Sequence, residues 1–169
     1  GNKLVQIGLK TQTVSTEPDA MIAEVLGSVV GLPVLTNPND SYMQGTFGGE
    51  ITNNNFLYVR SYAADDRLWE VNVVPNDLGK YTAERIDLKS PVPGVADIVW
   101  NGQALWGVSS ARIYRINPDE RDVSSWPIPA TGPLAELRGK TFGAAWTLGN
   151  GNLQLSDNAS GNLYQIAIG

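Results

Sequence analysis

A five-residue motif recurs four times along the chain, in the order polar, aliphatic, aromatic or aliphatic, polar, aliphatic. Its copies are KLVQI at Lys3–Ile7, RLWEV at Arg67–Val71, RIYRI at Arg112–Ile116 and NLYQI at Asn162–Ile166. The second residues of these copies lie 64, 45 and 50 residues apart. A period of about 20–50 residues indicates a solenoid, a propeller or a similar array, so it constrains the fold strongly.

The last three copies of the motif have similar neighbours. Short segments rich in β-branched and aromatic residues precede and follow the motif, and such residues are typical of strands. Turns rich in Asn and Gly separate the first two strands of each unit, as in hairpins. The expected first strands are 49–52, 96–100 and 142–147, the second strands are 56–59, 104–108 and 152–156, and the fourth strands are 80–88 and 123–129. Four antiparallel strands per unit indicate a propeller blade.

We therefore predict an all-β fold, a β-propeller-like arc of three to four four-stranded antiparallel blades in a single domain. Its blade-like units are residues 1–47 (partial), 48–93, 94–129 and 130–169 (partial). The alternative is an antiparallel β-sandwich or barrel, which also has short strands at close spacing. Propellers typically close with about four to eight blades. We therefore expect a second polypeptide to complete the ring, either an upstream fragment of the same precursor or another copy.

Composition excludes several classes of function. The chain has no His and no Cys, which removes Ser-His-Asp triads, thiol catalysis, zinc fingers and disulfides. A net charge of −5 argues against nucleic-acid partners and anionic membrane surfaces. The best apolar run, residues 21–35, is too short and too interrupted to cross a membrane. We expect no metal and no cofactor.

Several segments together resemble a propeller-like repeat domain of unknown function that is found in secreted and cell-surface proteins of fungi and bacteria. The segments include QGTFGGEITNNNFLYV at Gln44–Val59 and FGAAWTLGNGNLQLSDNASGNLYQI at Phe142–Ile166. The chain is similar to the C-terminal two-thirds of such a domain. The resemblance implies a propeller-like fold and a secreted or cell-surface location, and it implies no catalytic residues.

Three side chains are candidates for ligand binding: Asp97, Trp126 and Asp157. Asp97 lies in an expected inner strand near a central channel, although an acid there can also hydrogen-bond a turn backbone. Trp126 lies in an expected outer strand, where it can present a flat face to a sugar ring or pack at the sheet edge. Asp157 opens the turn SDNASGN, which lacks the spacing of an EF-hand calcium loop and is typical of an Asx-rich turn.

Other residues carry weaker signals. Asn39 and Asn158 begin the chain's two N-x-S/T sequons and are candidate glycosylation sites. Trp69, Tyr114 and Tyr164 occupy the same slot in successive motif copies. Equivalent slots favour equivalent packing between blades over an aromatic sugar platform.

We expect a non-catalytic extracellular binding or adhesion module that recognises a glycan or a protein. The alternative is one chain of a processed enzyme, whose site would lie in the propeller's central channel and would use residues other than His. A third hypothesis is a scaffold that closes another chain's propeller.

Overall fold

A computed structural model gives the fold of the chain. The structure describes residues 3–10, 20–34, 42–43, 47–48, 56–61, 67–147 and 151–168. These residues form strands and one short 3-10 helix, η1 (Pro133–Leu137). The predicted all-β fold is confirmed. No helix in the described part of the chain is long and apolar enough to span a membrane.

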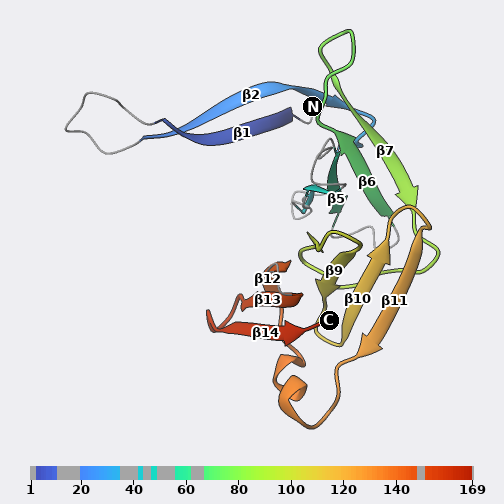
Figure 1. Ribbon diagram of the computed structural model, residues 1–169, viewed down its shortest axis with the longest axis vertical. Coiled ribbons are helices and arrows are strands. Elements are labelled where there is room, and N and C mark those ends of the chain that lie inside the picture. Colours follow the sequence, from blue (N-terminus) through green and yellow to red (C-terminus); the bar gives the residue numbers. More distant parts are fainter. Residues whose placement is uncertain are drawn as a thin grey trace.

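The N-terminal half forms a seven-stranded sheet with the order β1-β2-β7-β6-β5-β3, in which β4 also pairs with β5. Its strands are β1 (Lys3–Lys10), β2 (Ala20–Val30), β3 (Tyr42–Met43), β4 (Phe47–Gly48), β5 (Phe56–Ser61), β6 (Arg67–Asn72) and β7 (Tyr81–Asp87). The hairpin β1–β2 extends away from the rest of the molecule (Figure 1). It joins the sheet through a parallel pairing of β2 with β7, which the antiparallel repeat did not predict.

Two smaller antiparallel sheets follow. The second sheet has the order β11-β10-β9-β8, and the third has the order β12-β13-β14. Their strands are β8 (Val99–Trp100), β9 (Leu105–Val108), β10 (Arg112–Asn117), β11 (Asp122–Pro127), β12 (Phe142–Thr147), β13 (Asn152–Asp157) and β14 (Leu163–Ala167). In both sheets, neighbours in space are also neighbours in sequence, as in the blade of a propeller.

The same slot of the motif pairs with the corresponding residue of the preceding strand in all three sheets. Trp69 lies opposite Val59, Tyr114 opposite Gly107, and Tyr164 opposite Leu155. The motif strands β6, β10 and β14 are therefore equivalent. Trp69 and Tyr114 are each 3% exposed, as the equivalence of their slots predicts, and Tyr164 packs against the core of the third sheet.

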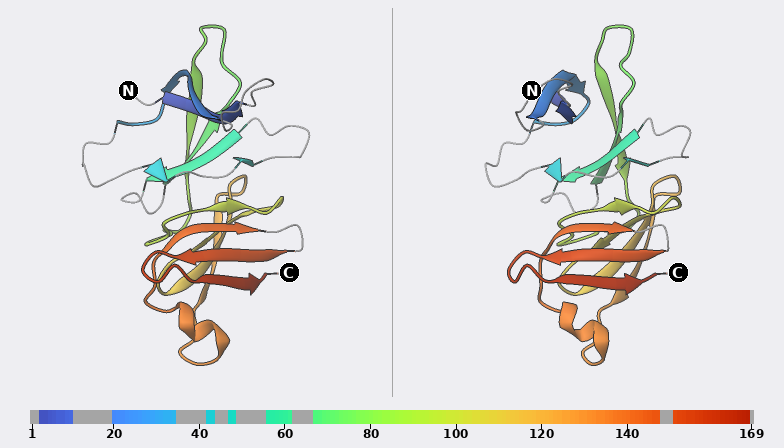
Figure 2. Two further views of the ribbon diagram at one scale, coloured as in Figure 1. Left: turned by 90° about the vertical axis from the view of Figure 1, so that its left-hand side faces the viewer. Right: turned by 60° about the vertical axis from the view of Figure 1, so that its left-hand side comes forward.

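Apolar residues fill the space between successive sheets. One cluster joins Tyr58, Leu68 and Ile86 of the first sheet to Leu105 and other residues of the second. Another joins the second sheet to the third, and its members are Val99, Trp106, Val108, Ile113, Ile128, Leu137, Phe142, Leu153, Leu155 and Ile166. The side chains of a strand alternate between its two faces, so the middle sheet contributes to both clusters. The arrangement is compatible with a propeller-like or a barrel fold (Figure 2).

Candidate functional site

Trp126 lies in β11, the outer strand of the second sheet, and is 48% exposed. The register places it opposite Ile113, whose side chain packs toward the third sheet. Its indole ring stacks on that of Trp106, with ring centroids 5.9 Å apart and planes inclined by 14°. Trp106 is 8% exposed, so the pair extends from the core to the surface. The sequence candidate thus has both an edge-packing contact and a free face.

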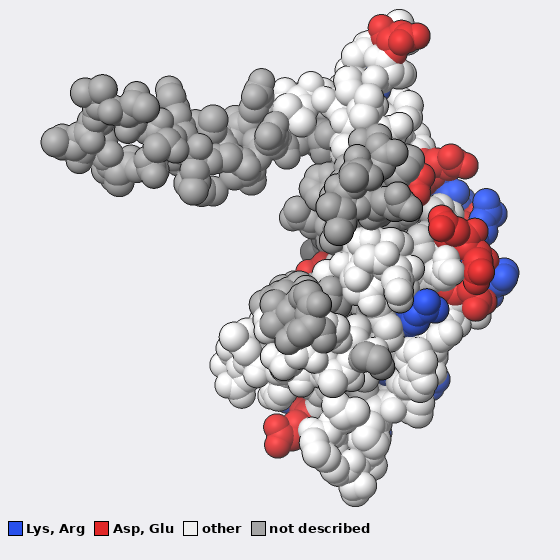
Figure 3. Space-filling view, viewed as in Figure 1, with Lys and Arg blue, Asp and Glu red and all other residues white. Residues whose placement is uncertain are grey.

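Beside Trp126 lies a groove of about 360 Å³. Both Trp rings line it, together with aliphatic side chains from β10, η1 and the end of the chain, Ile113, Leu134, Ile166 and Ile168. None of these side chains ionises, so the groove offers shape and apolar surface and supplies no general acid or base. Charged residues gather along the edge formed by β7, β10 and β11, whereas the described surface over β14 is mostly uncharged on the face drawn in Figure 3.

The indole nitrogen of Trp106 is a buried donor inside this region. Among the described residues, Trp106 Nε1 has no hydrogen-bond partner. A buried donor left unsatisfied costs about 1–3 kcal/mol.

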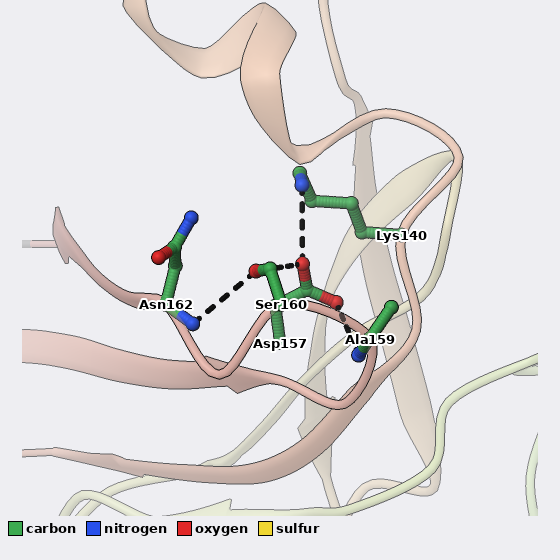
Figure 4. A network of polar contacts seen from close by, with 5 residues as sticks. All are labelled: Lys140, Asp157, Ala159, Ser160 and Asn162. Carbon is green, nitrogen blue, oxygen red and sulfur yellow. Dashed lines mark hydrogen bonds and ion pairs between the residues drawn. The ribbon is translucent and has the colours of Figure 1, made fainter.

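Asp157 holds a tight polar network at the turn between β13 and β14 (Figure 4). Ser160 Oγ donates a hydrogen bond to Asp157 Oδ2 over 2.6 Å, and the Ala159 N–H donates to Oδ1 over 3.1 Å. Lys140 Nζ forms an ion pair with Oδ2 at 3.1 Å and also lies 5.6 Å from the centre of the Tyr164 ring.

These contacts determine the charge state of the carboxylate. The Ser160 hydroxyl, the Ala159 N–H and Lys140 lower the pKa of Asp157 to about 2, although its burial opposes the shift. The hydrogen bond to Asp157 raises the pKa of Lys140. The Asp157 side chain is only 2% exposed, and its carboxylate faces the turn. Ser109, which is also buried, closes the preceding hairpin in the same way by accepting bonds from the Ala111 and Arg112 N–H groups.

Asp97 is half-buried just before β8. Its Oδ1 accepts a hydrogen bond of 2.9 Å from the N–H of the next residue, Ile98. Neither Asp97 nor Asp157 lines the groove beside Trp126, so the structure does not bring the three sequence candidates together.

The two sequons have different outcomes. Asn39 lies outside the described residues. Asn158 is exposed in the β13–β14 turn, and its backbone N–H donates to the Thr141 carbonyl over 3.0 Å. Its side chain therefore has room for a glycan, and glycosylation there stays a prediction.

Sequence reasoning missed a pair of facing acids. The register places Glu70 of β6 opposite Glu84 of β7, and both line a small hollow of about 290 Å³. Burial raises the pKa of Glu70, and Glu84 raises it further, against a hydrogen bond with Tyr58. Burial and Glu70 in turn raise the pKa of Tyr58. The pair is seen only once the register between β6 and β7 is known, and the sequence alone does not give that register.

Comparison with known protein families gives a match over nearly the whole chain. The family described as "Repeat of unknown function (DUF6923)" matches residues 2–169. No curated protein matches the chain, and no solved structure does.

Proposed function

Since this chain belongs to the DUF6923 family of repeats of unknown function, we propose that it is a non-catalytic binding or adhesion module that acts outside the cell. Its ligand binds in the groove beside Trp126. The proposal depends above all on one observation, the half-exposed Trp126 at the mouth of an apolar groove of about 360 Å³.

Burial of the exposed part of Trp126 supports a useful affinity. A Trp side chain buries up to about 250 Å², so covering about half of it contributes roughly 3 kcal/mol at about 25 cal/mol per Å². The lining side chains that the structure describes do not ionise, so these contacts favour binding over chemistry.

The extracellular setting has separate support. The sequon at Asn158 is exposed, which glycosylation in a secretory compartment requires. The resemblance of Phe142–Ile166 to domains of secreted and surface proteins points the same way.

The test is a comparison of three purified chains on an array that carries both glycans and extended peptides. The chains are the wild type, Trp126→Ala and Leu78→Ala. Leu78 is a matched control because it is an apolar side chain, 78% exposed, in the β6–β7 loop. We expect the wild type and Leu78→Ala to bind the same ligands, and Trp126→Ala to bind them at least tenfold more weakly.

The outcomes show which class of ligand the groove binds and whether the groove binds a ligand. Binding to peptides that depends on Trp126 supports a protein-binding module. Binding to glycans alone that depends on Trp126 keeps the groove as the site and makes the module a lectin. Equal binding by all three chains would refute a role for the groove.

A further inference from the structure

The side chain of Asn101 folds back over the turn between β8 and β9. Asn101 Oδ1 accepts hydrogen bonds from the Gln103 N–H over 3.0 Å and from the Ala104 N–H over 2.9 Å. The Asn101 N–H donates to the Ala104 carbonyl over 3.1 Å, which closes the turn. Asparagine side chains that bond the backbone in this way form Asx turns. Such a turn encloses the next peptide unit of the chain, so the Asn101 carboxamide is held beside the backbone nitrogen of Gly102.

Gly102 leaves this nitrogen accessible. The residue is exposed and has a φ of 99°, in the left-handed region that favours glycine. A Cβ atom added there would have no neighbour within 4 Å, so the space around the residue is open. The Gly102 N–H makes no hydrogen bond to any described residue. One turn thus holds an unshielded backbone nitrogen next to a carboxamide carbon.

Asn76, in the β6–β7 loop, has the same arrangement of donors and a different successor. Its Oδ1 accepts hydrogen bonds from the N–H groups of Leu78 and Lys80, both over 3.0 Å. The next residue is Asp77, whose Cβ crowds its own backbone nitrogen and whose carboxylate opposes a negative charge there. Asn76 is exposed, so access of water does not set it apart from Asn101. It is therefore a matched comparison within the same chain.

Asn117, in the β10–β11 turn, gives a second comparison. Its Oδ1 accepts hydrogen bonds from the N–H groups of Asp119 and Glu120 over 3.1 and 3.2 Å. The next residue is Pro118, whose nitrogen has no hydrogen to give up. Among the asparagines that the structure describes, Asn101 alone precedes a glycine.

We propose that Asn101 is a modification site at which the side chain deamidates without an enzyme, by reaction with the Gly102 nitrogen. That nitrogen gives its proton to solvent and bonds to Asn101 Cγ. The Cγ–Nδ2 bond then breaks, and Nδ2 takes up a proton and leaves as ammonia, so a cyclic succinimide remains. The N–H groups of Gln103 and Ala104 already bond Oδ1, and they stabilise the negative charge that this oxygen carries in the tetrahedral intermediate.

Water then opens the succinimide in one of two ways. Attack at Cγ gives aspartate at position 101, which keeps an acceptor for both N–H groups of the turn and adds one negative charge. Attack at the main-chain carbonyl gives isoaspartate, which lengthens the main chain by one carbon atom close to Ala104. Ala104 is fully buried, so this second product disturbs the core beside the turn. No residue of the turn lines the groove beside Trp126, so the modification is separate from the proposed function.

The first test is to incubate the folded wild-type chain in mildly alkaline buffer made with heavy-oxygen water. Peptide mapping by mass spectrometry then locates each converted asparagine. We expect one heavy oxygen atom at position 101, with both aspartate and isoaspartate present, and conversion at least tenfold faster than at Asn76. Asn150, which also precedes a glycine, lies outside the described residues, and the map reports it separately.

A variant and a denatured sample test which features of the turn matter. Asp77→Gly gives Asn76 a glycine successor and keeps the two donors on its Oδ1, so its conversion should rise at least tenfold. The same measurement on the wild-type chain unfolded in urea shows what the Asn-Gly sequence does without the turn. We expect Asn101 to react at least as fast in the folded chain as in the unfolded one.

Three results would overturn the inference. Equal conversion of Asn101 and Asn76 in the wild type would show that the glycine successor does not select the site. A slower reaction of Asn101 in the folded chain than in urea would show that the Asx turn protects the side chain. An Asn76 that stays unreactive in folded Asp77→Gly would refute the part given to the two N–H donors.

Discussion

Gly107 of β9 packs tightly against the segment before β8. A Cβ atom added at Gly107 would lie 2.5 Å from Val95 Cγ1 and 3.1 Å from the Asp97 carbonyl oxygen. Carbon atoms in contact are ordinarily about 3.5–4.0 Å apart. Val95 is 0% exposed and cannot rotate into solvent. We therefore expect Gly107→Ala to destabilise the fold by forcing the 95–98 segment away from β9.

The magnitude follows from these distances. Overpacking a core typically costs about 1–3 kcal/mol, and a contact more than an ångström too short against a fully buried side chain belongs at the upper end. We expect a loss of about 2–3 kcal/mol in the free energy of unfolding. For a chain of 169 residues, this corresponds to a fall in Tm of roughly 5–10 °C.

Urea unfolding followed by Trp fluorescence measures the loss, and a double-mutant cycle identifies its cause. Val95→Ala removes the clashing methyl group but leaves a cavity, so alone it should cost about 2 kcal/mol. In the double variant the new Cβ of residue 107 occupies part of that space. We expect its loss to be at least 1 kcal/mol smaller than the sum of the single losses. Additive losses, or a Gly107→Ala chain within 0.5 kcal/mol of the wild type, would refute the close approach.

Three further predictions concern charge and modification. The pKa of Asp157 is lowered to about 2, so its ionised form stabilises the fold above the unfolded pKa of about 3.9. Thermal unfolding of the wild type should show this stabilisation fading as the pH falls from 5 to 2. An equally steep loss of stability in Asp157→Asn would contradict the prediction. Glu84→Lys should raise the free energy of unfolding by about 0.5–1 kcal/mol, because it replaces a like-charged cross-strand pair. Since the raised pKa of Glu70 makes the folded chain hold that proton more tightly, the contribution of Glu70 to stability falls as the pH rises above about 4.3, and urea titrations should show a smaller loss over this range in Glu84→Lys than in the wild type. Secretion from a eukaryotic host should add glycan mass at Asn158, seen by intact mass spectrometry and absent in Asn158→Gln.

The candidate site was only partly accessible to sequence reasoning. Trp126 was a candidate because its flat ring lies in an expected outer strand, and the structure gives it a half-exposed side chain. The groove beside it combines Trp106, Leu134 and Ile166, which are up to 60 residues apart. No local pattern specifies which of these side chains meet, because their contact depends on the angle at which the third sheet packs on the second.

For the acidic residues too, local contacts could be predicted from the sequence and long-range contacts could not. The Asx-rich sequence that follows Asp157 correctly indicated a turn, in which the Asp157 carboxylate accepts a hydrogen bond from the Ala159 N–H two residues further on. That Lys140 neutralises the Asp157 carboxylate could not be inferred, because this contact spans 17 residues. The facing pair of Glu70 and Glu84 needed the cross-strand register.

The sequence by itself determined the repeating unit. Alternating apolar residues and Asn-Gly turns specify hairpins through local φ/ψ preferences and a period of two. The last three motif copies fall in equivalent strands β6, β10 and β14, whereas the first lies in β1 of the N-terminal hairpin. The tertiary structure decided what neighbouring units share: the parallel contact of β2 with β7, the close approach at Gly107, and the groove between β14 and Trp126. These depend on long-range packing, in which a side chain's position is set by residues far away in the chain. The candidate site lies between the repeats, where the repeating pattern carries no information.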